Sequence, residues 1–408
     1  MEKLKKVVNI VDAPCGCGKT TSAINMINNS TDEERYMYIT PYLTEVQRIK
    51  DSCASKKFKE PKIVNSSGSK IDGLVRLISN GENIVTTHAL FKHFDEIIIE
   101  LLRINNYTLI MDEVADVVEI LEITKKDLDI ILKNCAGTGE DGVLEWKDKE
   151  YTGEYDKYKK LCELGCLTIY GENSNKIVLF WLFPISVFRA FSEIYILTYF
   201  FDAQIQKYYF DYYGVEYNYL YTRSYNFTKE KQKYDTKIYK NLINICSNKR
   251  LNKIGEEYYS ISHNWFSRLK KDDVEEVIAK TLKKNIHNFF QNICRTNSKD
   301  NMWTTFKSEK SVLSGTGYTK GFVSLNARAT NDYKEKKSVA YLANRFFNPL
   351  IKKFFYQREI KVNEDKFALS ELLQFIFRSQ LREKRPINLY LPSKRMRDIL
   401  QNWLDTCE

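Results

Sequence analysis

The sequence contains few histidines and no long uninterrupted run of hydrophobic residues. Four histidines among 408 residues argue against a histidine-based metal site. The longest apolar stretch, residues 176–191, contains Pro184 and Arg189 and is too short to cross a bilayer. The first apolar run near the N-terminus is interrupted by Asn9, which is not typical of a secretory signal peptide. We therefore expect a soluble protein without a membrane partner.

The cysteines also lack the spacing of the usual structural sites. Nine cysteines at irregular intervals do not suggest a disulfide framework. Cys162 and Cys166 have helical spacing, but no second pair of cysteines or histidines accompanies them, as a zinc site would require. This cysteine usage favours a reducing, cytoplasmic environment.

The overall composition is typical of a globular protein, and the C-terminal third of the chain is basic. Hydrophobic residues make up 43% and charged residues 28%, and the length is sufficient for two or three domains with sizeable cores. The net charge of +10 is unevenly distributed, because residues 301–408 hold 20 Lys/Arg against 11 Asp/Glu, a balance of +9. This asymmetry favours either a polyanionic partner or a solvated basic face.

Hydrophobic patterning predicts two α/β units, residues 1–235 and 236–408. Strands that alternate with helices, such as the helix predicted over residues 90–104, indicate a parallel sheet covered on both faces. Charged and tyrosine-rich residues from about 120 to 180 predict a subdomain inserted into the first unit. Strands of the first unit are predicted at residues 6–12, 35–40, 83–87, 107–113 and 193–199.

The second unit has a weaker form of the same pattern. A helical stretch is predicted up to about residue 295, a further helix over residues 368–382, and a last helix from Lys394. Strand candidates are residues 240–247, 321–326 and 387–392.

The segment "APCGCGKTT", residues 13–21, lies between the first predicted strand and a helix expected from Lys19. It is open to three interpretations: a phosphate-binding loop, a redox or metal site at Cys15 and Cys17, or a simple Gly-rich turn. The strand–turn–helix context favours the first, because backbone N–H groups of such a turn face a bound anion. C-x-C is also not the redox motif C-x-x-C. Nucleotide binding is therefore predicted for Pro14, Cys15, Gly16, Cys17, Gly18, Lys19, Thr20 and Thr21.

The chemistry of a nucleotide site assigns roles to particular side chains. Lys19 is expected to contact the β- and γ-phosphates, and Thr20 to place its hydroxyl on Mg²⁺. An apolar strand ends in Asp112-Glu113. Asp112 is expected to hold Mg²⁺ through water, and Glu113 to orient and deprotonate the attacking water.

These motifs resemble those of the superfamily-2 Asp-Glu-box helicases and translocases, most closely the compact helicases of bacteriophages. "APCGCGKTT" resembles their first motif, in which alanine is usual at the first position, and "DEVAD" resembles their second. Tyr38–Ile49 is similar to motif Ia, Val85–Phe91 to the Thr-Thr-His segment that follows it, and Thr198 occupies the place of motif III. The resemblance implies an α/β fold with two RecA-like lobes and parallel sheets, and ATP with Mg²⁺ as cofactors.

In the second unit, residues 322–333 resemble motif V and residues 374–382 resemble motif VI. The resemblance implies that Arg378, Arg382 and Gln374 complete the ATP site when the lobes close, where an arginine stabilises the transferring phosphoryl group. At i and i+4 on one helix, the two arginines are expected on one face. A solvated basic helix face is the alternative. Arg382 lies one residue later than the second arginine of the motif.

The resemblance further implies that nucleic acid lies across both lobes and is held by its phosphates. Hydroxyls and loop N–H groups at strand ends suit such contacts, which are independent of base sequence and sensitive to salt. Each residue also has a structural alternative, since Thr and Asn cap helices and His88 fits a cap or a core position equally well. The candidates are Thr40, Thr44, Thr86, Thr87 and His88 in the first lobe and Arg328, Thr330 and Asn331 in the second.

We therefore predict an ATP-dependent helicase or translocase that acts on single-stranded or duplex nucleic acid, with DNA favoured, in phage or bacterial DNA replication or recombination. One alternative is a packaging or remodelling motor that separates no strands. Another is a nucleic-acid-binding regulator with a degenerate ATP site, which the intact Lys19 and Asp112 argue against. The aromatic segment 207–227 is either a base-stacking platform or the packing at the joint between the lobes. The sequence indicates no particular oligomeric state.

Overall fold

The computed structural model describes residues 7–63, 68–171, 177–232, 234, 236–325 and 332–406. The chain divides into two compact units. The first comprises Met1–Ala13, Gly18–Lys231 and Asn348–Val362, and the second comprises Pro14–Cys17, Gln232–Phe347 and Asn363–Glu408. Within the described residues, none of the helices has the length and hydrophobicity needed to span a membrane.

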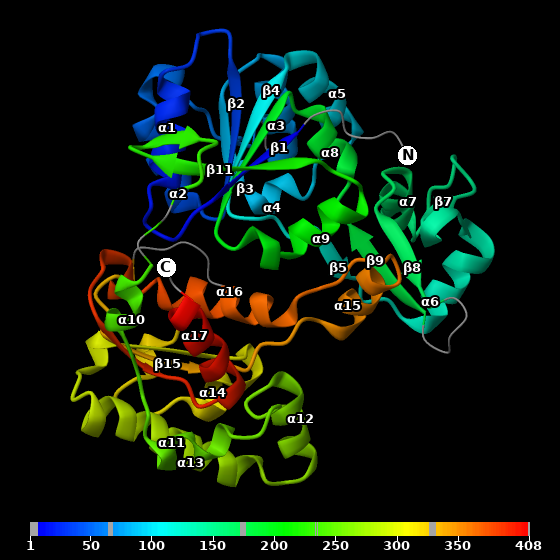
Figure 1. Ribbon diagram of the computed structural model, residues 1–408. Helices are drawn as coiled ribbons and strands as arrows, with labels where there is room; N and C mark the ends of the chain where they lie inside the picture. The colour runs from blue at the N-terminus through cyan, green and yellow to red at the C-terminus, as the bar shows by residue number, and fades with distance from the viewer. Residues whose placement is uncertain are drawn as a thin grey trace. The chain divides into compact units, whose positions relative to one another are not determined.

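The described residues of the first unit form a seven-stranded sheet in the order β12-β11-β1-β10-β4-β2-β3 (Figure 1). Neighbouring strands are parallel except β11 and β12. Every strand predicted for this unit is present, so the α/β class with a parallel sheet is confirmed. The strands are β1 (Val8–Asp12), β2 (Arg35–Thr40), β3 (Ile84–Thr87), β4 (Tyr107–Asp112), β10 (Glu193–Thr198), β11 (Tyr217–Arg223) and β12 (Asn226–Thr228).

The central strands of this sheet are continuous apolar runs because helices cover both of its faces. Ile10 in β1, Ile110 in β4 and Ile196 in β10 are completely buried. The single helix predicted over residues 90–104 is wrong, since Asp95 accepts a hydrogen bond from Ile98 N (3.0 Å) and begins a new helix there. The helices are α1 (Lys19–Asn28), α2 (Leu43–Ser52), α3 (Lys70–Ser79), α4 (His88–Phe91), α5 (Glu96–Asn105), α8 (Ile185–Ala190) and α9 (Ile205–Tyr212).

A small antiparallel subdomain lies in the chain between β4 and β10. The helix α15 (Pro349–Tyr356) belongs to the same unit, and its Phe354 ring lies 4.8 Å from the ring of Phe180. Arg358, just beyond α15, donates a hydrogen bond of 2.7 Å to Asp141 O. The elements of the subdomain are β5 (Val118–Ile120), α6 (Lys125–Ile130), β6 (Ala136–Thr138), β7 (Leu144–Trp146), α7 (Asp156–Glu163), β8 (Leu167–Tyr170) and β9 (Val178–Leu182).

The described residues of the second unit contain a four-stranded parallel sheet in the order β13-β16-β15-β14. Its core includes Trp303, Phe290 and Tyr390, all fully buried. The strands are β13 (Ile243–Ile245), β14 (Asn301–Thr305), β15 (Ser338–Leu342) and β16 (Ile387–Tyr390). The helices are α10 (Ile238–Leu242), α11 (Lys249–Asn252), α12 (His263–Lys271), α13 (Glu275–Asn288), α14 (Lys310–Leu313), α16 (Glu364–Ile376) and α17 (Lys394–Thr406).

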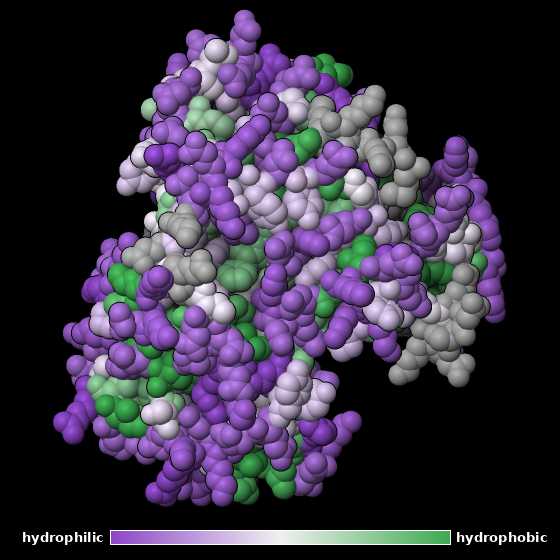
Figure 2. All heavy atoms as spheres, viewed as in Figure 1, coloured by the Kyte–Doolittle hydropathy of each residue, from purple (hydrophilic) through white to green (hydrophobic). Residues whose placement is uncertain are grey.

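Predictions for the second unit were less accurate. The strand predicted over residues 321–326 is wrong for the described residues 321–325, because a 3-10 helix extends to Gly321 and Phe322 makes only an isolated bridge to Trp303. The strand predicted at 240–247 is reduced to β13. The sequence reading missed β14 and β15, whose buried polar residues interrupt the apolar pattern. Hydrophilic residues dominate the face drawn in Figure 2, with hydrophobic residues in small groups.

Candidate nucleotide-binding site

The carboxyl ends of β1, β10 and β4 bring the two predicted motifs together. Strand β10 lies between the other two, with Asp12 of β1 in register with Thr198 and Leu197 in register with Asp112 of β4. Parallel strands end at one edge of a sheet, which is where α/β proteins bind ligands. The loop after β1 and the Asp112-Glu113 pair therefore share that edge.

The loop after β1 has the backbone expected of a phosphate-binding loop. Gly16 (φ 85°) and Gly18 (φ 81°) adopt left-handed conformations that strain residues with a side chain. Gly18 precedes α1, and neither a side-chain cap nor an acidic residue occupies the first turn of this helix. The backbone N–H groups there are suited to an anion. Lys19 Nζ donates a hydrogen bond to Ala13 O at the start of the loop.

Asp112 is a buried carboxylate at the end of β4 and is only 8% exposed. Its Oδ2 accepts hydrogen bonds from Thr20 Oγ1 and from the hydroxyl of Tyr38, both at 3.3 Å. Burial raises the pKa of Asp112 to about 6, and the charge of Glu113 adds to this effect, whereas Lys19 opposes it. In the described part of the chain, no ion pair neutralises this carboxylate. The site thus holds an oxygen ligand that a cation would stabilise.

Glu113 turns away from the strand immediately after Asp112. Its φ of 67° is left-handed, which is uncommon for a residue with a side chain and often marks a functional position. Its N–H donates to Leu197 O at 2.9 Å, which fixes the turn to β10. A ring nitrogen of His88, at the start of α4, lies 2.8 Å from Asp112 O, so the end of β3 is tied to the same segment.

Asp12 is a member of the site that the sequence reading did not single out. Its carboxylate accepts the N–H groups of Phe200 (2.9 Å) and Phe201 (3.0 Å), which follow β10. Burial raises the pKa of Asp12, although these two hydrogen bonds act in the opposite direction. An acidic residue before the loop was visible in the sequence, but its partners lie 188 and 189 positions further along the chain.

The residues predicted to bind nucleic acid in the first unit differ in exposure. Thr40 and Thr86 are buried at the ends of β2 and β3, Thr87 and His88 are half-buried at the start of α4, and Thr44 is exposed on α2. Their contacts with phosphates stay predictions. The other three candidates, Arg328, Thr330 and Asn331, lie outside the described residues.

The prediction that Arg378 and Arg382 share one helix face with Gln374 is wrong. Helix α16 ends at Ile376, and the chain continues into a 3-10 helix, Gln380–Glu383, capped by the side chain of Ser379. Gln374 is half-buried on α16, Arg378 is buried with its guanidinium carbon 5.5 Å from the centroid of the Phe375 ring, and Arg382 is exposed. The catalytic roles of these residues stay predictions.

The aromatic segment 207–227 contributes to packing within the first unit. Tyr209, on α9, is completely buried and donates its hydroxyl to Phe183 O at 2.6 Å. Phe227, on β12, stacks on Tyr195 of β10 with ring centroids 5.6 Å apart. Tyr225, in contrast, is 60% exposed.

The fold and the site define an α/β protein in which a glycine-containing loop and a buried carboxylate, Asp112, meet at the carboxyl edge of a parallel sheet. Residues 237–404 match a family model described as the YonV C-terminal Rossmann-like domain, and residues 118–181 match the YonV middle domain. The chain is 44% identical over 416 residues to the SPbeta prophage-derived uncharacterized protein YonV of Bacillus subtilis (strain 168), with 98% of each chain covered. The chain belongs to the YonV family.

Solved structures with similar folds are more distant. The structure of S. tokodaii Xpd4 matches with a TM-score of 0.49 and 10% identity, covering 97% of this chain and 94% of that one. The DUF1998 helicase MrfA bound to DNA and AMPPNP matches with a TM-score of 0.35 and 10% identity, covering 98% of this chain and 48% of that one. Since both TM-scores are below 0.5, we base the function on this chain's own residues.

Proposed function

We propose that this chain is a nucleic-acid-dependent ATPase that uses ATP hydrolysis to move along or unwind DNA or RNA. The observation that supports it most is the 3.3 Å hydrogen bond between Thr20 and Asp112 across 92 positions of sequence. It joins the start of the helix after the phosphate loop to the carboxylate that ends β4. Few sites other than those for nucleoside triphosphates combine these two features.

The residues present fit a magnesium ion. A hard cation takes oxygen ligands, and the Thr20 hydroxyl lies beside the buried Asp112 carboxylate, which has no ion-pair partner in the described part of the chain. Thr20 would hold the ion directly and Asp112 through water. When bound with ATP, the ion supplies neutralisation of charge on the β- and γ-phosphate oxygens.

The other residues of the site have separate roles in binding the phosphates and in activating water. Lys19 binds the β- and γ-phosphates, and the N–H groups at the start of α1 bind the phosphate oxygens. Glu113 orients the attacking water and accepts its proton. Thr40, Thr44, Thr86, Thr87 and His88 stay candidates for contacts with the nucleic-acid backbone, as do Arg378 and Arg382 for stabilising the transferring phosphoryl group. We place this activity in phage or bacterial DNA replication or recombination, and the prophage origin in the name of the B. subtilis relative is consistent with the phage alternative.

A polymer-stimulation assay tests this proposal. We expect ATP hydrolysis by the wild type to rise strongly with single-stranded DNA or single-stranded RNA, and to fall back as salt displaces the phosphate contacts. Lys19→Ala is the control and should show no hydrolysis in any condition. Strand separation of a labelled duplex then distinguishes a helicase from a motor that only translocates. Wild-type hydrolysis indifferent to both polymers would contradict the proposal.

A further inference from the structure

The hairpin β11–β12 ends in a strained turn that carries an exposed aromatic ring. Arg223 pairs with Asn226, so Ser224 and Tyr225 form the turn. Both have left-handed backbones, with φ of 48° and 59°. Such turns normally use Asn and Gly, because a side chain is disfavoured at positive φ. A 60% exposed tyrosine in this conformation is therefore unexplained by the hairpin alone.

The ring of Tyr225 lies against the phosphate loop. A Cβ built on Gly18 would lie 3.0 Å from Cδ1 and 3.3 Å from Cε1 of Tyr225. The backbone of the turn is fixed to the helix that follows the loop, because Asn25 Nδ2 donates to Tyr225 O at 3.1 Å. The ring is thus held beside Gly18, next to the N-terminus of α1, where the backbone N–H groups would bind a nucleotide's phosphates.

The order of strands indicates which part of a nucleotide would reach this ring. Asp112, on β4, lies on the β10 side of β1, whereas β11 and its hairpin lie on the opposite side. The terminal phosphate must face the Thr20–Asp112 pair, where the metal and the attacking water act. The other end of the triphosphate, which carries the nucleoside, is therefore directed to the side of the hairpin.

We propose that Tyr225 stacks on the base of the bound nucleotide. This inference rests on the proposed function only in that the loop binds a nucleotide. An aromatic ring offers a flat apolar surface that suits the face of a base, and such stacking contributes about 1–3 kcal/mol per base, or about 5- to 150-fold in affinity.

The test compares ADP with pyrophosphate, a probe without a base, on the full-length chain with Mg²⁺. Tyr225→Ala is expected to weaken ADP binding about 5- to 150-fold by calorimetry, with pyrophosphate affinity unchanged. Tyr225→Phe should retain ADP affinity because the ring is kept. Tyr356→Ala, which removes another tyrosine that is 70% exposed, is the matched control.

Two results would overturn the inference: unchanged ADP affinity in Tyr225→Ala, or equal losses for ADP and pyrophosphate, which would make the ring a support of the loop. The readout separates this inference from the proposed function. If Tyr225→Ala weakens ADP binding but neither polymer stimulates hydrolysis by the wild type, the inference is supported and the proposed function is contradicted. A wild type that binds neither ADP nor pyrophosphate loses both.

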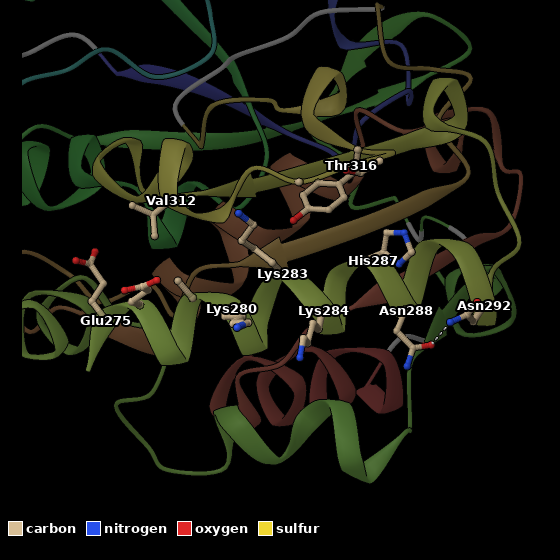
Figure 3. Close-up of a pocket in the computed structure, with 13 residues that line it drawn as sticks. Glu275, Lys280, Lys283, Lys284, His287, Asn288, Asn292, Val312 and Thr316 are labelled. Carbon is tan, nitrogen blue, oxygen red and sulfur yellow. Dashed lines mark hydrogen bonds between the residues drawn. The ribbon is translucent and has the colours of Figure 1, made fainter. Parts of the chain in front are cut away.

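A different observation concerns a groove of about 970 Å³ in the second unit (Figure 3). Helix α13 forms one wall, and the segment around Gly315 and Thr316 contributes to its lining. Lys280, Lys283 and Lys284 line the groove, spaced so that they share one side of the helix.

Two acidic residues, Glu275 and Glu276, also line the groove, but in the described part of the chain neither forms an ion pair with its lysines. None of the three lysines has an ion-pair partner there, whereas Glu275, at the beginning of the helix, lies 3.5 Å from Lys270. Asn288 and Asn292 continue the row and are hydrogen-bonded to each other at 3.0 Å. A line of ammonium groups followed by amides beside a glycine-containing segment matches the donors that bind a nucleic-acid backbone.

We infer that this groove binds the phosphates of a single nucleic-acid strand, as part of the polymer site of the proposed motor. Reversing the charge of Lys280, Lys283 and Lys284 to Glu together is expected to weaken binding of a labelled oligothymidylate at least about tenfold and to reduce the salt slope by about 2. ATP hydrolysis without polymer should be unchanged. The matched control is the triple variant Lys249→Glu, Lys253→Glu and Lys271→Glu, all exposed in the same unit.

Equal losses in the two triple variants would show only a general charge effect and overturn this second inference. A competition experiment with inorganic polyphosphate tests whether the groove distinguishes nucleic acid from other polyanions. If polyphosphate competes as well as the oligonucleotide at equal phosphate concentration, the groove is a general anion site and not a nucleic-acid site. If the wild type binds oligonucleotide through the groove but its ATP hydrolysis is not stimulated, the proposed motor function is contradicted and the inference about the groove is supported.

Discussion

Glu113→Gln is expected to lower the rate of ATP hydrolysis by about 10²–10⁴-fold, the contribution of a positioned general base, with the affinity for ATP nearly unchanged. Glutamine keeps the size of the side chain but cannot accept the proton of the attacking water. The backbone at Glu113 is fixed by its hydrogen bond to Leu197 O, so the substitution should not displace the turn. Phosphate release and ATP affinity, both measured with Mg²⁺, check the prediction.

Glu122→Gln is the matched control, because it makes the same change of glutamate to glutamine at an exposed position of the same unit, outside the Asp-Glu motif. It should hydrolyse ATP at the wild-type rate. Wild-type hydrolysis by Glu113→Gln would remove Glu113 from the mechanism. A parallel loss of ATP affinity would instead assign it to binding.

Asp112→Asn is expected to abolish hydrolysis and yet to stabilise the protein at pH 7.5 without Mg²⁺. The pKa of Asp112 is raised to about 6 by burial, so the native state holds an unfavourable charge at this pH. The rise of the pKa from its usual value of 3.8 to about 6 corresponds to at most about 3 kcal/mol. Asparagine removes the charge and still offers Oδ1 to Thr20 or Tyr38. The urea midpoint, measured with a chelator present, should therefore increase.

The pH dependence of the urea midpoint tests whether the charge of Asp112 causes this difference in stability. For a carboxyl group whose folded pKa is raised, the destabilisation is absent below the unfolded value, develops between about 4 and 6, and is complete above 6. The midpoints of wild type and Asp112→Asn should therefore converge as the pH falls from 6 to 4. A lower midpoint for Asp112→Asn at pH 7.5 would show that the carboxylate stabilises the native state without a cation. Mg²⁺ with nucleotide should stabilise the wild type alone.

Local sequence was sufficient to predict where the loop after β1 and the Asp112-Glu113 pair lie in the fold. The loop after β1, with its glycines, and Lys19 at the start of α1 are consecutive in the sequence, so their relative positions follow from short-range geometry. The apolar strand that ends at Asp112 was recognised for the same reason. The pairing of the two motifs was expected from their resemblance to helicases, and the contact between Thr20 and Asp112 is consistent with it.

Prediction failed where packing opposes the local pattern. Strand β14 begins at Asn301 and β15 begins at Ser338, and both polar residues are completely buried. The hydroxyl of Thr296 forms hydrogen bonds with both side chains. Hydrogen bonds to distant residues compensate the burial, and no periodicity reveals such partners. Helix α16 likewise ends before Arg378, although helical spacing predicted that it would continue to residue 382.

The sequence by itself determined the α/β class, the strands of the first sheet, and the positions of the glycine-containing loop after β1 and of the Asp-Glu pair after β4, because each depends on neighbours within a few positions. Only the tertiary structure decided that β10 separates the two motifs, that Asp12 binds the segment after β10, and that the ring of Tyr225 lies on Gly18. The reason is physical. Strand order and contacts between distant residues arise from the burial of whole faces, to which each residue contributes too little to leave a local signature.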